Sequence, residues 1–408
     1  MISVEEAKAI IFRQQLQTGI ESIDFNFSLG RTLAEDILAD RNMPPFDRVT
    51  MDGIAINYSD YLNEIRKWIV ANVQYAGEAA SCLTDAGQCI EVMTGAVLPN
   101  GCDTIIRYED LQEDLNSSKE KHFELIEIAI KKGQNIHFAG SDKKVNDIVL
   151  NIGQIIASSD IALLATVGKQ KVEVYKKLNI AVIATGDELT KIDVHPEEFQ
   201  IRASNQHLIT AALKEIGAES DQYLMRDDLN NLKDWLDKCL KQYDIVVITG
   251  AVSKGKADFI PSVLHELKVI ELFHGVAQRP AKPFWFGRKQ HCLVFAMPGN
   301  PVSATVCTYV YLLPFIQMHQ GKKYFKFKAK VTVDITFKPS LNYFMQAKIS
   351  QNKDGNFIAN PFIGNGSGDL TNLAEINAFV ELPSSEDRFN LNEFYNVYFT
   401  RNIICEQL

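Results

Sequence analysis

The chain has 408 residues, 46% of them hydrophobic, which suits two to four globular domains with their own cores. Its net charge of −9 argues against a broad nucleic-acid-binding face, although a local basic pocket for a small anion stays open. The seven cysteines are scattered, odd in number and never spaced as C-x2-C, which argues against a disulfide framework and a structural zinc site.

The N-terminal stretch MISVEEAKAI is acidic and amphipathic, unlike a signal peptide. No apolar run reaches the roughly 18 residues that a membrane span needs, so we expect a soluble, cytoplasmic protein. Residues 3–17 predict a helix in which Ser3 is the cap and Glu6 completes a capping box. A strand near residues 25–27 and a short helical stretch around residues 34–38 follow.

The segment RNMPPFDRVTMDGIAI, residues 41–56, predicts a fixed loop. Its two adjacent prolines forbid a helix and favour extended structure. Phe46, Met51 and Ile54 are apolar and should be buried, which a plain surface turn does not explain. Fixed loops often carry function, so a functional loop and a surface turn are both retained.

Residues 57–139 predict short strands and turns, including an apolar strand at 104–106 and a polar loop or hairpin tip at 111–122. This part is expected to be a small β-rich domain inserted into another. Residues 158–167 then predict a helix that Gly168 closes.

From Asn179 onward, apolar strands alternate with helices, which predicts a parallel sheet. The carboxyl ends of parallel strands lie along one edge, where open α/β sheets bind ligands. Asn300 as cap and Pro301 at the first helical position predict a helix start with free N–H groups for an anion. The strand ends carry Thr185, Gly186, Asp187 and Glu188; Thr249 and Gly250, followed by Ser253 and Asp258; and Pro298, Gly299 and Asn300.

The strand end at Thr249 and Gly250 is also similar in sequence to a phosphate-binding loop of nucleotide hydrolases. Gly250-x4-Gly255-Lys256 fits that motif, but Ala257 stands where a Ser or Thr must hold magnesium. We therefore reject the nucleotide-hydrolase motif and keep a ligand loop and an ordinary strand-to-helix loop as alternatives.

Two cations lie close by in the sequence, Arg279 and Lys282, and are candidates to bind a second anion. A surface ion-pair cluster is the alternative for them. Carboxylates beside phosphates commonly bind a divalent cation such as magnesium. The residues alone thus predict a site for a phosphorylated or otherwise anionic small molecule, with or without metal.

The last part, residues 325–408, returns to alternating apolar and polar residues and predicts a small antiparallel sheet or barrel. Ser367 lies in the glycine-rich loop IGNGSGDL, for which flexibility alone is the alternative to binding.

Six motifs together resemble the molybdopterin molybdenumtransferase family of the MoeA type, whose relatives include the gephyrin E domain. They are, in order, PPFDRVTMDGIAI, MTGAVLPNG, ATGDEL, TGAVSKGKADF, RPAKPFWFG and MPGNPVSA, and they extend over essentially the whole chain. The resemblance implies a multidomain α/β plus β fold and an elongated homodimer. Its four domains would be a linker domain (1–24, 41–52 and 140–176), an inserted β-rich domain (25–40 and 53–139), a molybdopterin-binding α/β domain (177–321) and a C-terminal β barrel (322–408).

The resemblance also implies a reaction in which molybdate is inserted into adenylylated molybdopterin with release of AMP, using magnesium (Mg2+). A molybdopterin adenylyltransferase would supply the pterin. Catalytic roles would fall to Asp52, acting from the partner subunit, and to Asp187, Glu188, Asp258, Arg279 and Lys282, with Glu188 and Asp258 as metal ligands. Substrate-binding roles would fall to Thr94, Thr185, Gly186, Asn205, Thr249, Gly250, Ser253, Pro298, Gly299, Asn300, Ser303 and Ser367, of which Ser367 joins Arg279 and Lys282 in attracting molybdate.

Four positions depart from the family pattern. Ala251 and Ala281 stand where the family has glycines, Lys256 where it has an acidic or neutral residue, and Gln346 where an arginine is expected. These departures motivate a second hypothesis, a non-catalytic paralogue that binds the pterin or serves as a scaffold. Hydrolysis of another nucleotide is a third hypothesis, which the complete motif series disfavours.

Overall fold

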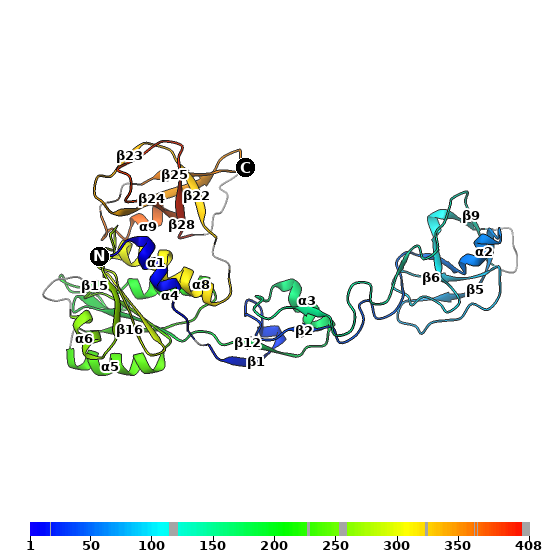
Figure 1. Cartoon of the computed structure of the whole chain (residues 1–408), viewed down its shortest axis with the longest axis horizontal. Coiled ribbons are helices and arrows are strands. Elements are labelled where there is room, and N and C mark those ends of the chain that lie inside the picture. The colour runs from blue at the N-terminus through cyan, green and yellow to red at the C-terminus, as the bar shows by residue number, and fades with distance from the viewer. Residues whose placement is uncertain are drawn as a thin grey trace. The chain divides into compact units, whose positions relative to one another are not determined.

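A computed structural model describes residues 1–16, 18–113, 121–226, 229–252, 259–322, 325–362, 364 and 366–401, with only the backbone of 229–231. The chain forms two compact units (Figure 1). The sheet–barrel unit comprises Met1–Glu21, Gly30–Thr32 and Val174–Leu408, and the inserted unit comprises Ser22–Leu29 and Leu33–Glu173.

Helix α1 (Val4–Phe12) begins where the sequence predicts. The Ser3 hydroxyl accepts from the Glu6 N–H at 3.1 Å, and the Glu6 carboxylate accepts from the Ser3 N–H at 2.8 Å, so the capping box is confirmed. The helix ends earlier than predicted because the positions that would continue its apolar stripe after Ile11 are the polar Gln14 and Gln15.

The sheet–barrel unit contains a six-stranded sheet in the order β16-β13-β17-β21-β20-β18. Its first four strands pair in parallel, as predicted, whereas β20 pairs antiparallel with both of its neighbours, β21 and β18. All residues of the three central strands β13, β17 and β21 are buried, which explains their continuous apolar runs. The strands are β13 (Ile180–Thr185), β16 (Asp221–Met225), β17 (Ile245–Thr249), β18 (Ile270–His274), β20 (Trp285–Lys289) and β21 (Cys292–Met297).

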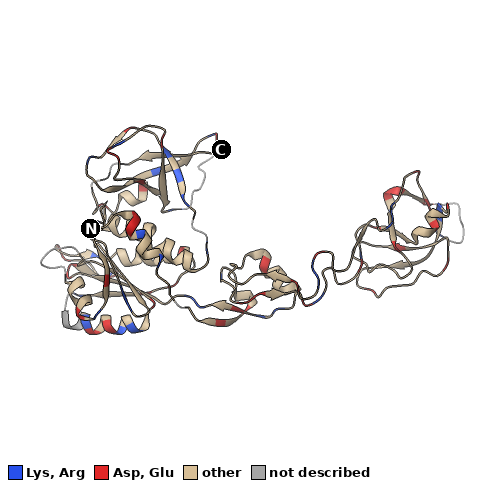
Figure 2. Cartoon of the chain, in the orientation of Figure 1, with Lys and Arg blue, Asp and Glu red and all other residues tan. Residues whose placement is uncertain are grey.

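Helices cover both faces of this sheet. One face packs against α1, α4 (Asn205–Glu215), α7 (Pro301–Cys307) and α8 (Leu313–His319), in a core that also reaches the barrel. The other packs against α5 (Leu229–Gln242) and α6 (Ile260–Glu266). Acidic and basic residues are interspersed along α5 (Figure 2).

One helical run, Pro301–His319, is long and apolar enough to cross a membrane by length and composition, which was not expected from the sequence. Because 78% of its most apolar window is buried inside the protein, it is a core helix of this unit. A π-helical turn, η3 (Thr308–Leu312), joins α7 to α8 within this run.

The C-terminal strands form a closed barrel, as predicted, but one pair, β22 with β25, is parallel where antiparallel pairing was expected. They follow the order β24-β25-β22-β28-β26, and pairing of β24 with β26 closes the ring. Strand β19 (Gln278–Arg279), which lies between β18 and β20 in the sequence, pairs in parallel with β24. The ring strands are β22 (Phe327–Val331), β24 (Asn342–Gln351), β25 (Phe357–Pro361), β26 (Ala378–Leu382) and β28 (Phe394–Phe399); β23 (Ile335–Thr336), β27 (Arg388–Phe389) and α9 (Asn372–Glu375) lie outside it.

The inserted unit is rich in β structure, as predicted, with a six-stranded sheet in the order β7-β4-β6-β5-β9-β8. Its strands are β4 (Gly53–Ile56), β5 (Lys67–Gln74), β6 (Gln88–Val92), β7 (Thr104–Arg107), β8 (Leu111–Glu113) and β9 (His122–Leu125). Helices α2 (Tyr58–Leu62) and α3 (Ser158–Thr166) and the short strands β2 (Ile37–Leu38), β3 (Arg48–Val49), β10 (Ile136–His137) and β11 (Ile148–Leu150) complete it, and β1 (Ile20–Asp24) pairs with β12 (Lys171–Tyr175).

Three local predictions are wrong. Phe25–Phe27 forms a 3-10 turn because the Asp24 carboxylate accepts from the Asn26 N–H at 2.9 Å and starts a turn there. Residues 37–38 form a strand that pairs with β11 instead of a helix. Phe46 and Met51 are each 37% exposed and not buried, whereas Ile54 is fully buried as expected.

Candidate functional site

The carboxyl ends of the central strands meet at one edge of the sheet, as the sequence predicts. The register aligns Ala184 with Thr249 and Thr249 with Met297, so the loops that follow these strands are neighbours. The Gly250 N–H donates to the Met297 carbonyl at 3.1 Å and fixes two of these loops together.

Gly250 is required by both its conformation and its surroundings. Its φ is +110°, which disfavours any side chain. A Cβ at this position would lie 2.2 Å from the Thr185 carbonyl oxygen. Glycine therefore allows the second strand end to approach the first.

Asn205, at the start of α4, joins these strand ends from the side. Its Nδ2 donates to the Thr249 Oγ1 at 3.0 Å and to the Gly299 carbonyl at 2.6 Å. Asn205 is 9% exposed, and its Oδ1 has no hydrogen-bond partner among the residues described. The resulting cradle presents backbone and one buried amide oxygen.

A cavity of about 720 Å³ lies between this sheet edge, the segment 278–283 and the barrel. It brings together sequence-predicted residues from three separate stretches of the chain. These residues are Arg279, Lys282, Pro298, Gly299, Asn300, Ser303 and Ser367.

The two predicted cations, Arg279 and Lys282, are exposed on the cavity wall. The Arg279 guanidinium carbon lies 5.6 Å from the ring centroid of Tyr343 and 5.7 Å from that of Phe337. This stacking uses the face of the guanidinium and leaves its N–H edges for an anion. Tyr343 was missed by the sequence reasoning, because nothing in the barrel strand indicated that it faces Arg279.

The helix start at Asn300 and Pro301 is confirmed, but Asn300 does not cap the helix with its side chain. Its Nδ2 donates instead to the Ser367 Oγ at 2.7 Å, and the Val302 N–H donates to the Ser367 carbonyl at 3.1 Å. The helix N-terminus is therefore tied to the glycine-rich loop of the barrel, which leaves fewer N–H groups for an anion than predicted.

Two alanines line the cavity with positive φ, Ala251 at +49° and Ala281 at +68°. Both stand where the resemblance leads us to expect glycine, and the backbone conformation explains that expectation. The Ala281 carbonyl accepts from the Gln278 Nε2 at 3.0 Å, and the Tyr311 hydroxyl donates to the Gln278 Oε1. The sequence reasoning also missed Gln278, which is fully buried behind the cations.

Gln346 forms part of the cavity wall and is 8% exposed. Its Oε1 and the Asn372 Nδ2 have no hydrogen-bond partners in the described part of the chain. Both amides crowd Gly364, where a Cβ would lie 2.2 Å from the Asn372 Nδ2 and 3.0 Å from the Gln346 Nε2. A neutral amide thus occupies the position where an arginine was expected.

Other predicted residues do not line this cavity, among them the cradle residues Asn205, Thr249 and Gly250. Thr185, Gly186, Asp187 and Glu188 follow β13, and the last two are exposed. A Cβ at Gly186 would lie 2.6 Å from the Glu188 carboxylate oxygens, so the glycine makes room for that carboxylate. Ser253 and Asp258 lie outside the described residues, as does Lys256.

No group of three or more His, Cys, Asp and Glu that could hold a metal is found within the described residues. Magnesium commonly uses only one or two carboxylates and takes its other ligands from water and substrate phosphates. Glu188, exposed at the strand end, fits that donor chemistry.

Asp52 and Thr94 form a separate site in the inserted unit. The Asp52 Oδ1 accepts from the Thr94 N–H at 2.6 Å and from the Thr94 hydroxyl at 2.7 Å. These bonds, the one from the backbone first, lower the pKa of Asp52. The structure therefore joins two residues that the sequence had placed in different motifs.

Family models match this chain along most of its length. The MoeA N-terminal region (domain I and II) matches residues 2–168, a probable molybdopterin binding domain matches residues 181–318, and the MoeA C-terminal region (domain IV) matches residues 328–395. The molybdopterin molybdenumtransferase of Synechocystis sp. is 34% identical over 402 residues, covering 98% of this chain and 100% of that protein.

The chain belongs to the MoeA family. A second relative, the molybdopterin molybdenumtransferase of Staphylococcus epidermidis, is 31% identical over 416 residues and covers 100% of this chain and 97% of its own. The crystal structure of the molybdopterin biosynthesis MoeA protein from Pyrococcus horikoshii OT3 is 28% identical, with a TM-score of 0.80 over 98% of this chain and 100% of that one. The MoeA-type architecture thus holds for both units and for the barrel.

Proposed function

We propose that this protein is a molybdopterin molybdenumtransferase, which inserts molybdate into adenylylated molybdopterin and releases AMP during molybdenum cofactor biosynthesis. The observation that supports this most is the cavity, where two exposed cations lie with Pro298, Gly299 and Asn300 from the carboxyl edge of the sheet. Full-length similarity to proteins named for this transfer supports the same reaction.

The cradle would bind the pterin and its phosphates. Gly250 and Gly299 would let the ligand approach the backbone closely. The buried Asn205 Oδ1, which has no hydrogen-bond partner among the described residues, would accept a hydrogen bond from the ligand. Thr249, held by the Asn205 Nδ2, keeps the two strand-end loops at a fixed spacing. Preorganised groups of this kind lower the reorganisation needed during reaction.

Arg279 and Lys282 would attract molybdate and the phosphoanhydride, since both are anionic. Ser367, joined to Asn300, brings the barrel loop to the same cavity. Positive charge at this end would also stabilise the negative charge that develops on the departing AMP phosphate.

Glu188, with Asp258, would hold magnesium at the end of β13. When bound, the ion would supply charge neutralisation at the phosphate oxygens. Asp187 lies beside Glu188 in the same exposed loop and would orient the ion's ligands.

The finer assignments are part of the same proposal and rest on the family resemblance of the motifs. The protein would act as a cytoplasmic homodimer of four-domain subunits, and Asp52 would serve the partner's cavity with its pKa already lowered by Thr94. A molybdopterin adenylyltransferase would deliver the pterin.

The test is AMP release from adenylylated molybdopterin in the presence of magnesium, with and without molybdate. We expect molybdate-dependent AMP release by the full chain and a loss on the order of tenfold in Lys282→Met, because one charge-assisted contact is removed. Lys214→Met, an exposed lysine of α4 that does not line the cavity, is the matched control and should keep full activity.

Bound pterin without AMP release would contradict catalysis and favour the paralogue hypothesis, in which the departures at Ala251, Ala281 and Gln346 have removed the chemistry. Equal losses in Lys282→Met and Lys214→Met would contradict the placement of the anion site.

A further inference from the structure

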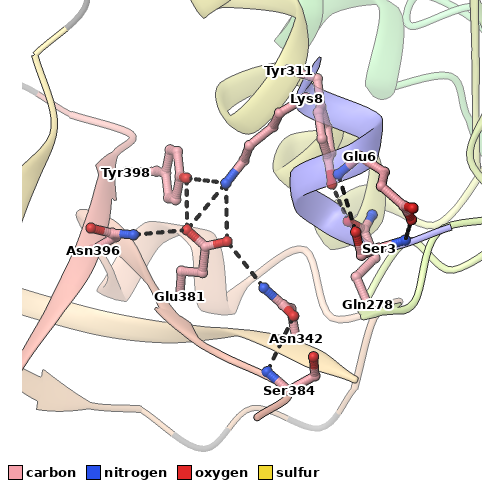
Figure 3. Close-up of polar contacts among 10 residues, drawn as sticks. All are labelled: Ser3, Glu6, Lys8, Gln278, Tyr311, Asn342, Glu381, Ser384, Asn396 and Tyr398. Atoms are coloured by element: carbon pink, nitrogen blue, oxygen red, sulfur yellow. Dashed lines mark hydrogen bonds and ion pairs between the residues drawn. The ribbon is translucent and has the colours of Figure 1, made fainter. Parts of the chain in front are cut away.

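A buried ion pair joins the N-terminal helix to the barrel (Figure 3). The Lys8 Nζ on α1 lies 3.0 Å from the Glu381 Oε1 and 3.2 Å from the Oε2 on β26, and it donates to the Tyr398 hydroxyl at 2.6 Å. The Lys8 side chain is 19% exposed and that of Glu381 only 4%. No role for this pair follows from the proposed reaction, because neither residue lines the cavity of the candidate site.

The Glu381 carboxylate is surrounded by donors. Besides Lys8, it accepts from the Tyr398 hydroxyl at 2.8 Å, the Asn342 Nδ2 at 3.2 Å and the Asn396 Nδ2 at 3.3 Å. Burial acts to raise the pKa of Glu381, but Lys8 and the hydrogen bonds outweigh it and the pKa is lowered. A charge pair this deeply buried gives little net stability, since desolvation offsets the attraction.

Asn342 carries the contact from Glu381 to the main chain beside the cavity. Its Oδ1 accepts from the Ser384 N–H at 3.2 Å, and its own N–H donates to the Ala277 carbonyl at 3.0 Å. Asn342 is also the register partner of Gln278 in the β19–β24 pair. The Ala277 N–H donates to the Ile2 carbonyl at 2.8 Å, so the segment that precedes α1 is also hydrogen-bonded to Ala277.

The residues that follow Ala277 are those that carry the cations. Gln278 holds the Ala281 carbonyl through its side chain, and in the sequence Arg279 directly follows Gln278 while Lys282 directly follows Ala281. Hydrogen bonds therefore connect the buried pair to the Asn342 side chain (Figure 3), and the Asn342 N–H connects to Ala277, the residue that precedes the segment with the two cations.

We propose that Lys8 and Glu381 are positioning residues, which act through Asn342 to hold the Arg279–Lys282 segment against the barrel at the spacing that the anionic substrate needs. The proposal rests on the proposed function for the identity of that anion, molybdate. Misplacement of a binding group by about an ångström is enough to change rates strongly, so this positioning matters without any contact to the substrate.

The test compares two variants of the full chain. Glu381→Met removes the carboxylate and leaves Lys8 without its partner, whereas Lys8→Met with Glu381→Met replaces the pair by apolar side chains. The double variant should regain most of the thermal stability that the single variant loses, because an apolar pair avoids the unpaired charge, although the buried Asn342 amide still lacks its acceptor. Neither variant restores the bond to Asn342, so both should show a KM for molybdate raised on the order of tenfold.

The control is Asp237→Met, which breaks the ion pairs of Asp237 with Lys241 and with Lys289 away from this segment; Lys289 is 21% exposed, similar to Lys8, and Asp237 is 30% exposed. Its KM for molybdate should stay within about twofold of the wild-type value. A double variant whose KM returns to wild type together with its stability would overturn the proposal, because the pair would then be structural only. The proposal would also fail if Asp237→Met raised the KM as strongly as the double variant.

Hydrogen exchange of the amides in residues 275–283 supplies a readout that needs no substrate. We expect these amides to exchange faster in the double variant, on the order of tenfold, and to be unchanged in Asp237→Met. Unchanged exchange in the double variant would overturn the positioning role. Failure of the wild-type chain to release AMP would instead overturn the proposed function, and the exchange measurement would still decide the positioning of this segment.

Discussion

The two regions that hold the candidate residues are built in opposite ways. In the sheet–barrel unit, the cradle at the sheet edge is fixed by buried groups: Gly250 against the Thr185 carbonyl and Asn205 across two loops. In the inserted unit, the exposed Asp52 is fixed by two hydrogen bonds from one exposed residue, Thr94.

This difference predicts how each region responds to mutation. A buried cradle has no room to relax, so small changes there should cost folding free energy. An exposed carboxylate is screened by water, so changes at the Asp52 turn should alter its titration and leave global stability nearly constant. The following experiments test that ordering.

Gly250→Ala should have the largest effect, a loss of about 3 kcal/mol or more in the free energy of unfolding, because strain at positive φ adds to overpacking. Denaturant unfolding measures it. Gly366→Ala is the matched control, since Gly366 has a similar φ of +113° but nothing within 4 Å of its Cβ position. Equal losses in the two variants would show that crowding against Thr185 is not the cause.

Asn205→Leu should cost about 2 kcal/mol of stability, because the Thr249 hydroxyl and the Gly299 carbonyl lose a buried donor. Ser204→Ala is the control at the adjacent helix cap, whose side chain makes no cap hydrogen bond, and it should stay within about 0.5 kcal/mol of wild type. A wild-type melting temperature in Asn205→Leu would contradict the view that this amide holds the cradle.

Ala281→Gly and Ala251→Gly should each stabilise the protein by about 0.5–1 kcal/mol. Glycine relieves the strain of positive φ in the folded state, and this gain exceeds the cost of the larger conformational entropy that glycine gives the unfolded chain. Ala277→Gly, at a position without positive φ, should destabilise by a similar amount. The opposite signs are the result to look for in thermal unfolding. Destabilisation by all three substitutions would mean that the cavity tolerates its alanines without strain.

Thr94→Val should have the smallest effect on stability, well below about 1 kcal/mol, since Asp52 is exposed. The hydrogen bonds lower the folded pKa of Asp52, so their stabilisation is present above its unfolded pKa of about 3.9 and is lost as the pH falls through the lower folded value. Removing the hydroxyl should raise that folded pKa, as NMR titration of the carboxyl would show. Thr84→Val, whose hydroxyl contacts Asp85 instead, should leave the Asp52 titration unchanged.

Much of this architecture follows from local pattern. The capping box at Ser3 and Glu6 sets the start of α1, and the fully apolar runs 245–248 and 292–296 indicate strands buried on both faces. Parallel strands bring their ends together whatever the loops contain, which is why the convergence of Thr249 and Pro298 could be predicted.

Other features depend on contacts between residues far apart in the chain, and the local sequence pattern does not predict such contacts. Asn300 was expected to cap the helix with its side chain, but its amide donates instead to the hydroxyl of Ser367, 67 residues away. Phe46 and Met51 were expected in the core, yet each is 37% exposed, because hydrophobicity alone does not specify which apolar side chains are buried.

The alternation of strands and helices after Asn179, the glycine at the second strand end and the family could be predicted from the amino-acid sequence, because each depends on short-range chemistry or on motifs in series. Long-range packing was needed to show that Tyr343 and Phe337 stack on Arg279, that Asp52 pairs with Thr94, and that Lys8 pairs with Glu381 across 373 residues. These contacts arise from the pairing of β19 with β24 and the docking of α1 on the barrel, which only the folded chain brings about.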